Sequence, residues 1–563
     1  MVIFKSRQPE IDLPTKITDW DWLFDSSYSP INTYPESQLA GYQNAVTKER
    51  VNWKQVKDYS TYISTALVKK YGLKEGQTMS LFSQNTIWYP VAMFGGLRVG
   101  AMISGASPAY NVEEMSYALK TAQAKFLMTT PGSMEVAAAS AKEAGIPKQN
   151  VFLLEGELSG YTTIQDLIRI GKSYGESGQV PAFKISPGKS NRDVCGFLSF
   201  SSGTTGLPKA VMIAHHNVIA QCLQIQQITP TEHKKTLAVL PLFHITGLVH
   251  GLHLPILLNA EVIMLPTFTM PSMLSTIVEY QLSELLLVPP ILIRLVRDEA
   301  TVSKYDLRHL KRFSSGAAPL SEEIIQLLQR KFPGTGFKQG YGMTESCSCI
   351  TAHPPDKYDY KYAHSGGAIV ANTEVKIIKE DGAEAGVGEP GEILARGPQI
   401  VMGYLNNEKA TRETFDADGW LHTGDQGAID DEGMIHILDR IKEMIKVKGI
   451  GVAPAELEDL LLGHPKVEDV AVMGVKDDYA GELPKAFVVL KSGVGASEKV
   501  GKELMAFVRE KKVRYKWIKE IEFVDEIPKS ASGKILRRVL RDRANNAEKS
   551  TKVLDAVGEK AKL

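Results

Sequence analysis

The sequence predicts a mixed α/β fold, with a large N-terminal domain of stacked αβ layers and a small α+β domain at the C-terminus. Short apolar runs alternate with helical patterns over residues 51–130 and again over residues 236–333. Such alternation is typical of parallel sheets that helices cover on both faces. Over residues 374–437 short apolar runs are instead separated by Gly-rich turns, which predicts a small β-rich subdomain.

The alternation is clearest between residues 236 and 333, where each short apolar run is followed by a helical pattern. Ser321, with Glu323 close behind it, is typical of a helix start. The predicted elements are, in order, strand 237–240, helix 247–258, strand 262–265, helix 271–281, strand 285–288, helix 291–298, a strand that ends at Phe313, and helix 321–332.

The charged segment 439–443 separates this large part from a compact α+β tail. We place the main domain boundary at Asp439, which gives an N-terminal domain of residues 1–438 and a C-terminal domain of residues 439–563. Ser497 has the side chain of a helix N-cap. The predicted elements of the tail are helix 455–462, strands near Val470 and Phe487, helix 497–511 and a strand near Ile521.

Composition excludes several classes of protein. The 563 residues include 65 Lys and Arg and 65 Asp and Glu, so no net charge attracts nucleic acid or an anionic membrane. Four cysteines are too few for a disulfide framework and fit a reducing compartment. Histidines, prolines, Asn259 and Glu261 interrupt the most apolar long stretch, residues 237–265, so we expect no transmembrane segment.

The loop Ser201-Ser202-Gly203-Thr204-Thr205-Gly206-Leu207-Pro208-Lys209 combines hydroxyls, glycines and one lysine. Glycines let backbone N–H groups approach an anion, hydroxyls can surround phosphate oxygens, and the lysine adds a positive charge. It is not a Walker A loop, because Leu207 and Pro208 separate Gly206 from Lys209. Taken alone, the loop is equally well a turn between two strands.

Two further segments carry groups that can hold a nucleotide. In residues 339–345, Tyr341 can stack on a purine and Glu345 can bind Mg²⁺, which prefers hard oxygen ligands and substrate phosphates. In residues 419–425, Asp425 can accept both ribose hydroxyls, at about 1.5–3 kcal/mol for each charge-assisted bond. The ordinary alternatives are a Gly-rich turn for the first segment and an Asx turn for the second.

Two more segments carry lysines. Residues 439–458 include Lys446 and Lys448 and are, taken alone, a charged linker before a helix. Residues 528–534 end in Lys534, just before a helix that we expect to begin near Ile535. A lysine beside Gly533 can bring charge to a distant site, although a solvated lysine is the ordinary alternative.

Together and in this order, the five motifs closely resemble those of the adenylate-forming superfamily, which contains acyl-CoA synthetases, peptide-synthetase adenylation domains and beetle luciferases. The resemblance spans residues 53–538. Pro241-Leu242-Phe243-His244 and Val452-Ala453-Pro454-Ala455-Glu456-Leu457-Glu458 look most like 4-coumarate–CoA ligases and related peroxisomal acyl-CoA ligases. The resemblance implies a β-barrel subdomain and a small, mobile C-terminal lid across the active site.

The resemblance also implies roles for individual residues. Lys534 is the expected catalytic lysine, and His244 and Lys446 are further catalytic candidates. Thr344 and Glu345 are expected to bind magnesium. The residues expected to bind ATP or AMP are Ser201, Ser202, Gly203, Thr204, Thr205, Lys209, Gly316, Ala317, Ala318, Gln339, Gly340, Tyr341, Gly342, Thr344, Asp425 and Arg440. The acyl site is assigned to His244, Gly340 and the hinge residue Lys442, and the coenzyme A site to Lys448 and Gly449.

The implied activity is that of an ATP-dependent acyl-CoA ligase for an aromatic or medium-chain carboxylic acid, with Mg²⁺ and coenzyme A. The acid attacks the α-phosphorus of ATP beside Lys534, giving acyl-AMP and pyrophosphate. The lid then rotates and presents Lys448, and the thiol of coenzyme A displaces AMP. Two residues depart from the family pattern: Ala210 replaces the usual glycine, and Gly451 replaces a glutamine expected in the thioester-forming state.

Other activities on the same fold stay open. One is an adenylating enzyme that passes the acyl group to a carrier protein, or a luciferase-like oxygenase. Another is a non-enzymatic binding protein, against which the intact Lys209, Glu345, Asp425 and Lys534 count.

The chain ends in Ala561-Lys562-Leu563, which resembles the Ser-Lys-Leu address of peroxisomal proteins. The polar run 541–552 can supply the free tail that such an address needs. We therefore expect the peroxisomal import receptor as a partner and a peroxisomal location, with the cytoplasm otherwise.

Overall fold

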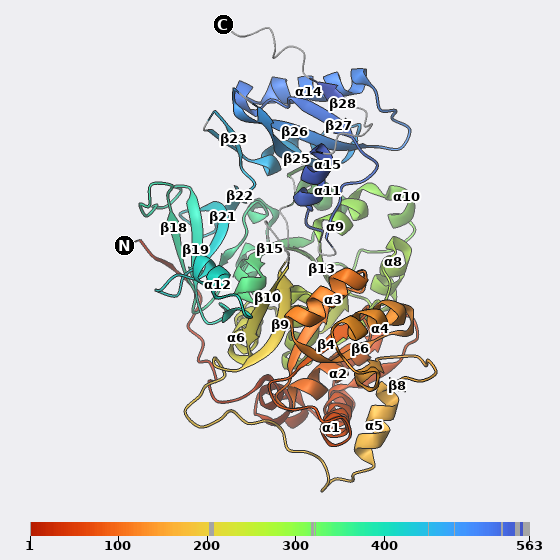
Figure 1. Cartoon of the computed structure of the whole chain (residues 1–563). Helices are drawn as coiled ribbons and strands as arrows, with labels where there is room; N and C mark the ends of the chain where they lie inside the picture. Colours follow the sequence, from red (N-terminus) through yellow and green to blue (C-terminus); the bar gives the residue numbers. More distant parts are fainter. Residues whose placement is uncertain are drawn as a thin grey trace.

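The computed structural model describes residues 2–201, 208–316, 320, 322–448, 450–477, 479–530, 533–545 and 552–554. The strands of these residues form five sheets. In Figure 1 the C-terminal domain lies at the top, above a larger part that contains four of the sheets. The mixed α/β fold that the sequence predicts is confirmed.

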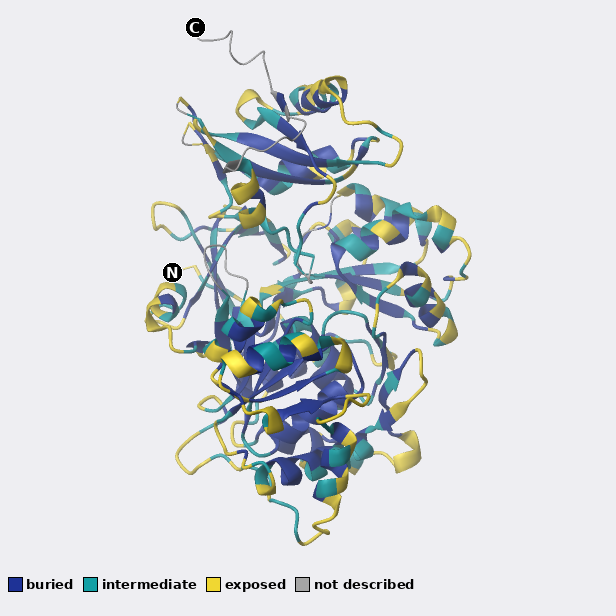
Figure 2. Cartoon of the chain, turned by 45° about the vertical axis from the view of Figure 1, so that its right-hand side comes forward, coloured by how far each residue is buried: buried dark blue, intermediate teal, exposed yellow. Residues whose placement is uncertain are grey.

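The first layer is an eight-stranded sheet with the order β20-β10-β9-β5-β4-β6-β7-β8. The strands from β9 to β8 are parallel, and β10 and β20 extend one edge in antiparallel fashion. Figure 2 shows strands of this region in dark blue, the colour of buried residues. The strands are β4 Thr78–Phe82, β5 Met102–Ala106, β6 Ala124–Thr129, β7 Val151–Leu153, β8 Thr162–Thr163, β9 Cys195–Ser201, β10 Lys209–Ala214 and β20 Gly403–Tyr404. The helices of this region are α1 Trp53–Lys69, α2 Trp88–Leu97, α3 Val112–Thr121, α4 Met134–Glu143, α5 Ile164–Lys172 and α6 His215–Gln227.

Two sheets follow from the alternation predicted over residues 236–333. Their orders are β11-β12-β2-β3 and β13-β14-β15-β16-β17, with parallel pairs from β11 to β2 and from β13 to β15. The strands are β2 Gly41–Asn44, β3 Arg50–Asn52, β11 Lys235–Ala238, β12 Glu261–Met264, β13 Glu284–Leu287, β14 Arg312–Ser315, β15 Gly336–Met343, β16 Ser348–Ala352 and β17 Ala368–Ile369. The helices are α8 Met270–Glu279, α9 Pro289–Arg297, α10 Glu299–Val302 and α11 Glu322–Lys331.

One predicted helix of this region has an unexpected form. Residues 247–258 contain a π-helical stretch, η6 (Gly247–His253), followed by the short α7 (Leu254–Leu257). Pro255 lies in the first turn of α7, where its missing N–H is tolerated. Nδ1 of the buried His253 donates to the carbonyl of Leu248 at 2.7 Å. The predicted helix is thus divided between His253 and Leu254, and residue periodicity does not reveal this division.

The predicted β-rich subdomain is an antiparallel sheet with the order β1-β18-β19-β21-β22. Its strands are β1 Phe4–Lys5, β18 Glu374–Ile378, β19 Gly391–Arg396, β21 Leu421–Ile429 and β22 Ile435–Arg440. The resemblance implied a barrel here, whereas the strand path of the described residues is open. Its edge is linked to β17 through the bridge between Met434 and Ala368 and the 2.7 Å hydrogen bond from Gly366 N to the carbonyl of Ile435.

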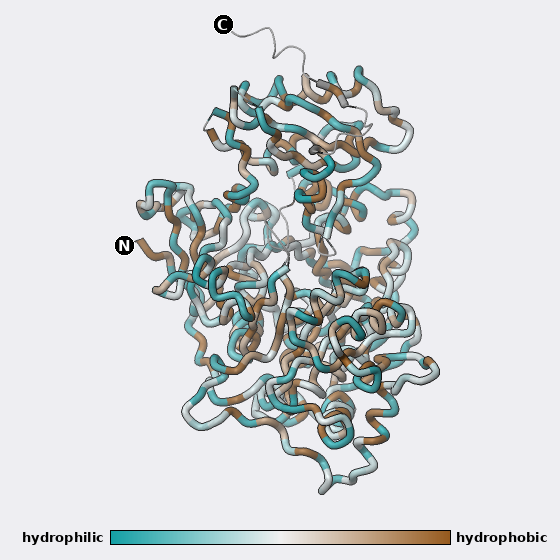
Figure 3. The backbone as a smooth tube through the Cα atoms, in the orientation of Figure 1, coloured by the Kyte–Doolittle hydropathy of each residue, from teal (hydrophilic) through white to brown (hydrophobic). Residues whose placement is uncertain are grey.

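The C-terminal domain has its own sheet, with the order β24-β23-β26-β27-β28 and β25 paired to β26. Ser497 accepts the N–H of Val500, as the N-cap prediction requires. In Figure 3 hydrophobic and hydrophilic segments alternate along this domain as along the larger part. The elements are β23 Ile445–Val447, β24 Ile450–Val452, α13 Pro454–Leu462, β25 Val467–Asp477, β26 Gly481–Leu490, α14 Glu498–Lys511, β27 Glu520–Phe523, α15 Arg537–Asn545 and β28 Lys552–Leu554.

A short connection joins the two parts. The boundary predicted at Asp439 falls one residue before the end of β22, and the C-terminal sheet begins at β23. Asp439 accepts the N–H of Ala455 at 3.1 Å, at the start of α13. Arg297, on α9, donates to the carbonyls of Leu462 at 3.1 Å and Glu468 at 3.3 Å. These bonds hold the C-terminal domain against α9 (Figure 1).

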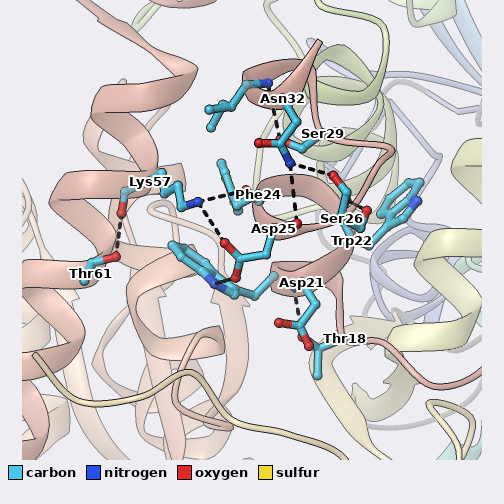
Figure 4. Close-up of polar contacts among 12 residues, drawn as sticks. Thr18, Asp21, Trp22, Phe24, Asp25, Ser26, Ser29, Asn32, Lys57 and Thr61 are labelled. Carbon is cyan, nitrogen blue, oxygen red and sulfur yellow. Dashed lines mark hydrogen bonds and ion pairs between the residues drawn. The ribbon is translucent and has the colours of Figure 1, made fainter.

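The N-terminal segment packs against α1 through a polar network that the sequence did not indicate. Lys57 of α1 donates to the carbonyl of Phe24 at 3.0 Å and pairs with Asp25 at 2.8 Å (Figure 4). Asp25 also accepts the indole N–H of Trp20 at 2.9 Å, while Asn32 donates to its carbonyl. The buried aromatic rings between these bonds fix the segment to the first layer.

Two structural absences bear on the sequence predictions. All four cysteines lie in the described ranges and are free thiols, as their small number predicts. Among the helices of the described residues, none has both the length and the hydrophobicity that crossing a membrane requires.

Gly171 of α5 provides a test of the packing between α5 and α1. A Cβ at this position would lie 1.8 Å from the carbonyl oxygen of Tyr62. Gly171→Ala must therefore push the helices apart, and overpacking of this kind costs about 1–3 kcal/mol. We expect a lower Tm by calorimetry. Gly132→Ala, where nothing lies within 4 Å, is the matched control, and an equal Tm for both variants would contradict the packing.

Candidate active site

A cavity of about 2000 Å³ lies where the larger part meets the C-terminal domain. Segments that are far apart in the sequence border it. They include the facing ends of β9 and β10, residues 338–345 apart from Tyr341, residues 422–424, the connection around residues 440–443, and residues 529–530, 534–539 and 541 of the C-terminal domain. These segments carry most of the residues that the sequence motifs single out.

The candidate phosphate loop joins two adjacent strands, since Ser201 at the end of β9 pairs with Lys209 at the start of β10. The Lys209 ammonium lies 4.6 Å from the centre of the Tyr404 ring. The Tyr404 hydroxyl donates a 2.8 Å hydrogen bond to Oε1 of the buried Glu345. The two ends of the loop thus belong to adjacent strands, and Lys209 borders the cavity next to the predicted magnesium ligand.

The candidate ribose site is built from a cross-strand pair. Asp425 of β21 lies opposite Arg440 of β22, whose Nε is 3.3 Å from Oδ1 of Asp425. The Tyr341 hydroxyl donates to Oδ2 of Asp425 at 2.9 Å. Burial raises the pKa of Asp425, while the charge of Arg440 and the hydrogen bond from Tyr341 act in the opposite direction. The structure therefore brings these three predicted residues together beside the cavity.

Lys534 comes to the cavity from the C-terminal domain. The preceding Gly533 has φ +82°, and a Cβ there would lie 3.0 Å from Pro290 of α9, so this turn requires glycine. Burial, followed by the positive charge of Arg440, lowers the pKa of Lys534 to about 8. Three nearby carboxylates oppose this shift and keep the ammonium charged near neutral pH: Glu443, Asp425 and Glu345.

This lowered pKa predicts how adenylation depends on pH. The charged fraction of Lys534 falls as the pH rises through about 8, so electrostatic stabilisation by its ammonium is lost above that pH. We expect kcat/KM of acid-dependent pyrophosphate exchange to fall there. The guanidinium of Lys534→Arg stays charged, so its residual activity should lack this fall. The same fall in the arginine variant would assign the titration to another group.

His244, Gly316 and Gly340 border the part of the cavity that the resemblance assigns to the acyl group. Burial lowers the pKa of His244 to about 4, so this ring is neutral at pH 7 and can act only as a hydrogen-bonding or packing group. Gly316 and Gly340 face each other, since a Cβ on Gly316 would lie 3.8 Å from the carbonyl oxygen of Gly340. The two glycines thus leave one wall of the cavity as bare backbone.

Gln339 and Gly342, which the sequence predicts to bind the nucleotide, also have structural roles. The Gln339 side-chain amide donates to the carbonyl of Ala363 and so ties β15 to a neighbouring loop. A Cβ on Gly342 would lie 1.7 Å from the carbonyl oxygen of Ser348, so the pairing of β15 with β16 requires glycine there. Both residues also border the cavity.

The structure does not bring Lys446 or Lys448 to the cavity. Both lie on the hairpin of β23 and β24, where Lys446 Nζ is 3.6 Å from Glu380 and the Lys448 ammonium is 4.2 Å from the ring centre of the exposed Tyr479. In the C-terminal domain, Lys534 faces the cavity and this hairpin faces away from it. Lys534 and the hairpin therefore cannot border the cavity at the same time. Lys442, in contrast, borders the cavity.

Some predicted site residues lie outside the described residues. These are Ser202, Gly203, Thr204, Thr205, Ala317, Ala318 and Gly449, together with the terminal Ala561-Lys562-Leu563.

Sequence reasoning missed two residues of the site. Tyr404 links Lys209 to Glu345, but an isolated Gly-Tyr pair between distant motifs carries no signal of that contact. Glu443 was included only as part of a charged segment, yet it borders the cavity beside Lys534. Its place directly after the expected hinge residue Lys442 is the one signal that could have identified it.

Comparison with known proteins agrees with this geometry. Residues 33–405 match the model of the AMP-binding enzyme family, and residues 456–534 match the AMP-binding enzyme C-terminal domain. The chain belongs to the AMP-binding enzyme family. This AMP-binding enzyme is 36% identical over 558 residues to 4-coumarate-CoA ligase 1 of Narcissus pseudonarcissus, with 96% of each chain covered. It is 35% identical to 4-coumarate–CoA ligase-like 1 of Arabidopsis thaliana, over 96% of this chain and 97% of the relative.

Solved structures share the fold of the AMP-binding enzyme. An anthranilate CoA ligase, AuaEII, in complex with anthranoyl-AMP has a TM-score of 0.82 at 26% identity, with 95% of this chain and 98% of that chain covered. An ATP-bound RpMatB-BxBclM chimera has a TM-score of 0.82 at 26% identity, with 95% of this chain and all of that chain covered. The resemblance to adenylate-forming enzymes and to 4-coumarate–CoA ligases is confirmed.

Proposed function

We propose that this AMP-binding enzyme is an ATP-dependent acid–CoA ligase, which activates a carboxylic acid as its acyl-adenylate and then forms the coenzyme A thioester. The observation that carries the proposal is the convergence of Lys209, Glu345 and Lys534 around one cavity, with Asp425 held next to it by Arg440. The 4-coumarate-CoA ligase relatives, which match over almost the whole chain, support it. So does the anthranilate CoA ligase structure, which contains an acyl-adenylate.

In the first step a carboxylate oxygen of the acid attacks the α-phosphorus of ATP. The new P–O bond forms as the bond to pyrophosphate breaks, and the products are acyl-AMP and pyrophosphate. Lys534 contacts the attacking carboxylate and the α-phosphate, and Lys209 offsets charge on the leaving phosphates. The ribose hydroxyls donate hydrogen bonds to the carboxylate of Asp425, which also accepts the Tyr341 hydroxyl. These bonds to Asp425 fix the position of the nucleoside.

Glu345 fits a magnesium ion. Oε1 accepts a hydrogen bond from Tyr404, which fixes the carboxylate at the border of the cavity beside Thr344. Within the described residues no cluster of three or more His, Cys, Asp and Glu can hold a metal alone, so the ion would depend on the nucleotide phosphates, as Mg²⁺ commonly does. When bound, Mg²⁺ neutralises charge on those phosphates.

In the second step the sulfur of coenzyme A attacks the carbonyl carbon of acyl-AMP, and AMP leaves. The C-terminal domain turns about the connection around Lys442, so that Lys534 leaves the cavity and the hairpin with Lys448 faces it. The outward position of that hairpin in the present structure supports such a turn.

The test combines two assays on one panel of carboxylic acids. We expect acid-dependent exchange of pyrophosphate into ATP without coenzyme A, and release of AMP with thioester formation when coenzyme A is added. Exchange without a thioester would favour transfer to a carrier protein or to oxygen. No exchange with any acid, in a protein that binds ATP, would favour a binding protein and overturn the proposal.

We further infer that the C-terminal Ala561-Lys562-Leu563 directs the protein to peroxisomes through the import receptor. The similarity of this tripeptide to Ser-Lys-Leu supports the inference. A fluorescent protein fused ahead of the intact tail should enter peroxisomes, and the same fusion without these three residues should stay in the cytoplasm. Equal import of both fusions would exclude this address.

A further inference from the structure

The wall of the cavity contains a cation without a contacting anion. Lys338 of β15 lies beside Ser314 of β14, which in turn pairs with Leu286 of β13, and all three border the cavity. Within the described part of the chain, the Lys338 ammonium has no hydrogen bond and no ion pair. The centre of the Tyr358 ring lies 5.6 Å from this ammonium.

The carboxylate nearest to this lysine is already engaged. Glu284 pairs with Arg312 and lies 3.4 Å from Nδ1 of His233. Burial alone would raise the pKa of Glu284, but bonds from His233 and Arg312 lower it to about 2. Burial lowers the pKa of Lys338, and the attraction of Glu284 does not offset this. The cavity therefore contains a cation that an incoming anion would stabilise.

The other polar groups near Lys338 are neutral. Burial lowers the pKa of His250 to about 4, so its ring is neutral at pH 7, and its Nε2 lies 3.1 Å from Oγ of Ser348. Burial raises the pKa of the Cys349 thiol, which keeps it protonated. The residues that border the cavity also include five aliphatic ones, Ile225, Ile228, Leu237, Leu254 and Leu258.

Lys338 and Lys534 mark two different ends of the cavity. The charged groups that face Lys534 are Arg440, Glu443, Asp425 and Glu345, whereas those that face Lys338 are Glu284 and Arg312. Along β15, Lys338 precedes Tyr341, which binds Asp425 near Lys534, by three residues, a backbone separation of about 10 Å at ~3.3 Å per residue. Because both lysines border the cavity, an acid whose reacting carboxylate lies at Lys534 can extend its far end toward Lys338.

We propose that Lys338 is a specificity-determining residue that binds the second carboxylate of a medium-length dicarboxylic acid. This rests on the proposed function, since it names the acid of that ligase reaction. The aliphatic wall packs on the methylene chain, and Lys338 pairs with the distal carboxylate. A monocarboxylic acid of equal length leaves the cation unpaired in an apolar site, which is unfavourable. A neutral hydroxyl at the far end offsets the charge less than a carboxylate does.

The experiment compares matched acids in both steps of the reaction, from hexanoic and hexanedioic acid to dodecanoic and dodecanedioic acid, with 4-hydroxycinnamic acid alongside. The wild-type enzyme should prefer the dicarboxylic acid in kcat/KM at one or more lengths. Lys338→Met, which removes the charge and keeps most of the side-chain length, should lower kcat/KM for that acid by about ten- to hundredfold, as expected for one charge-assisted bond. The same variant should gain activity on the monocarboxylic acid, and misfolding cannot cause a gain.

Lys331→Met, on α11 and outside the cavity, is the matched control and should leave the preference unchanged. The proposal is wrong if the wild-type enzyme prefers monocarboxylic acids or 4-hydroxycinnamic acid over every dicarboxylic acid. It is also wrong if Lys338→Met lowers activity on all acids equally. Either result leaves pyrophosphate exchange intact, whereas the absence of exchange with every acid would mean that the proposed ligase function itself has failed.

Discussion

Lys534→Ala should lower the rate of adenylation by about 10²–10³, the typical loss when one preorganised electrostatic group is removed. The ammonium lies in the cavity among Arg440 and three carboxylates, where burial makes its charge effective. Alanine cannot replace this charge. Acid-dependent pyrophosphate exchange measures the effect directly.

The second half-reaction separates a specific role from general damage. Thioester formation from supplied acyl-AMP and coenzyme A should largely survive in Lys534→Ala, because the proposed turn of the domain takes Lys534 out of the cavity. Lys516→Ala is a matched control in the C-terminal domain and outside the cavity, since its ammonium pairs with Glu456 at 2.6 Å. If both half-reactions fall equally in a folded Lys534→Ala protein, the role assigned to Lys534 is wrong.

Asp425→Asn should raise KM for ATP by about ten- to hundredfold, as expected when the charge is removed from hydrogen bonds worth about 1.5–3 kcal/mol each. The substitution keeps the shape of the side chain but leaves Arg440 without its cross-strand anion. The effect should appear in KM for ATP more than in KM for the acid, because Asp425 is assigned to the ribose.

Asp431→Asn is the control for this variant, since Asp431 is exposed in the turn between β21 and β22. It should leave both KM values unchanged. A rise in KM for the acid alone in Asp425→Asn would place Asp425 in the acyl site and contradict the ribose assignment.

Much of the fold could be predicted because it depends on local patterns. The alternation over residues 236–333 gave strands and helices whose ends differ from the observed ones by no more than two residues, apart from the divided helix at residues 247–258. The two-residue strand β1 escaped detection because its partner, β18, is more than 360 residues away in the sequence. A strand that short has no periodicity of its own.

The site was predictable as a set of motifs but not as a geometry. Asp425 and Arg440 were each identified, but their pairing depends on the register of β21 with β22, which includes an irregularity at Gln426 and Gly427. Lys338 precedes the recognised Gln339, and nothing in the sequence shows which face of β15 it occupies. Whether Lys534 or Lys448 faces the cavity depends on how one domain docks on the other, which no local pattern encodes.

The two hydrogen bonds from Arg297 to backbone carbonyls, described above, have a consequence for the rate of the catalytic cycle. If Lys534 must leave after the first step, Arg297 has to release Leu462 and Glu468 in every catalytic cycle and bind them again before the next one. The contact must be firm enough to hold the reactive arrangement and weak enough to give way. The guanidinium of Arg297, far from the reacting atoms, would then help to set the turnover rate of the enzyme.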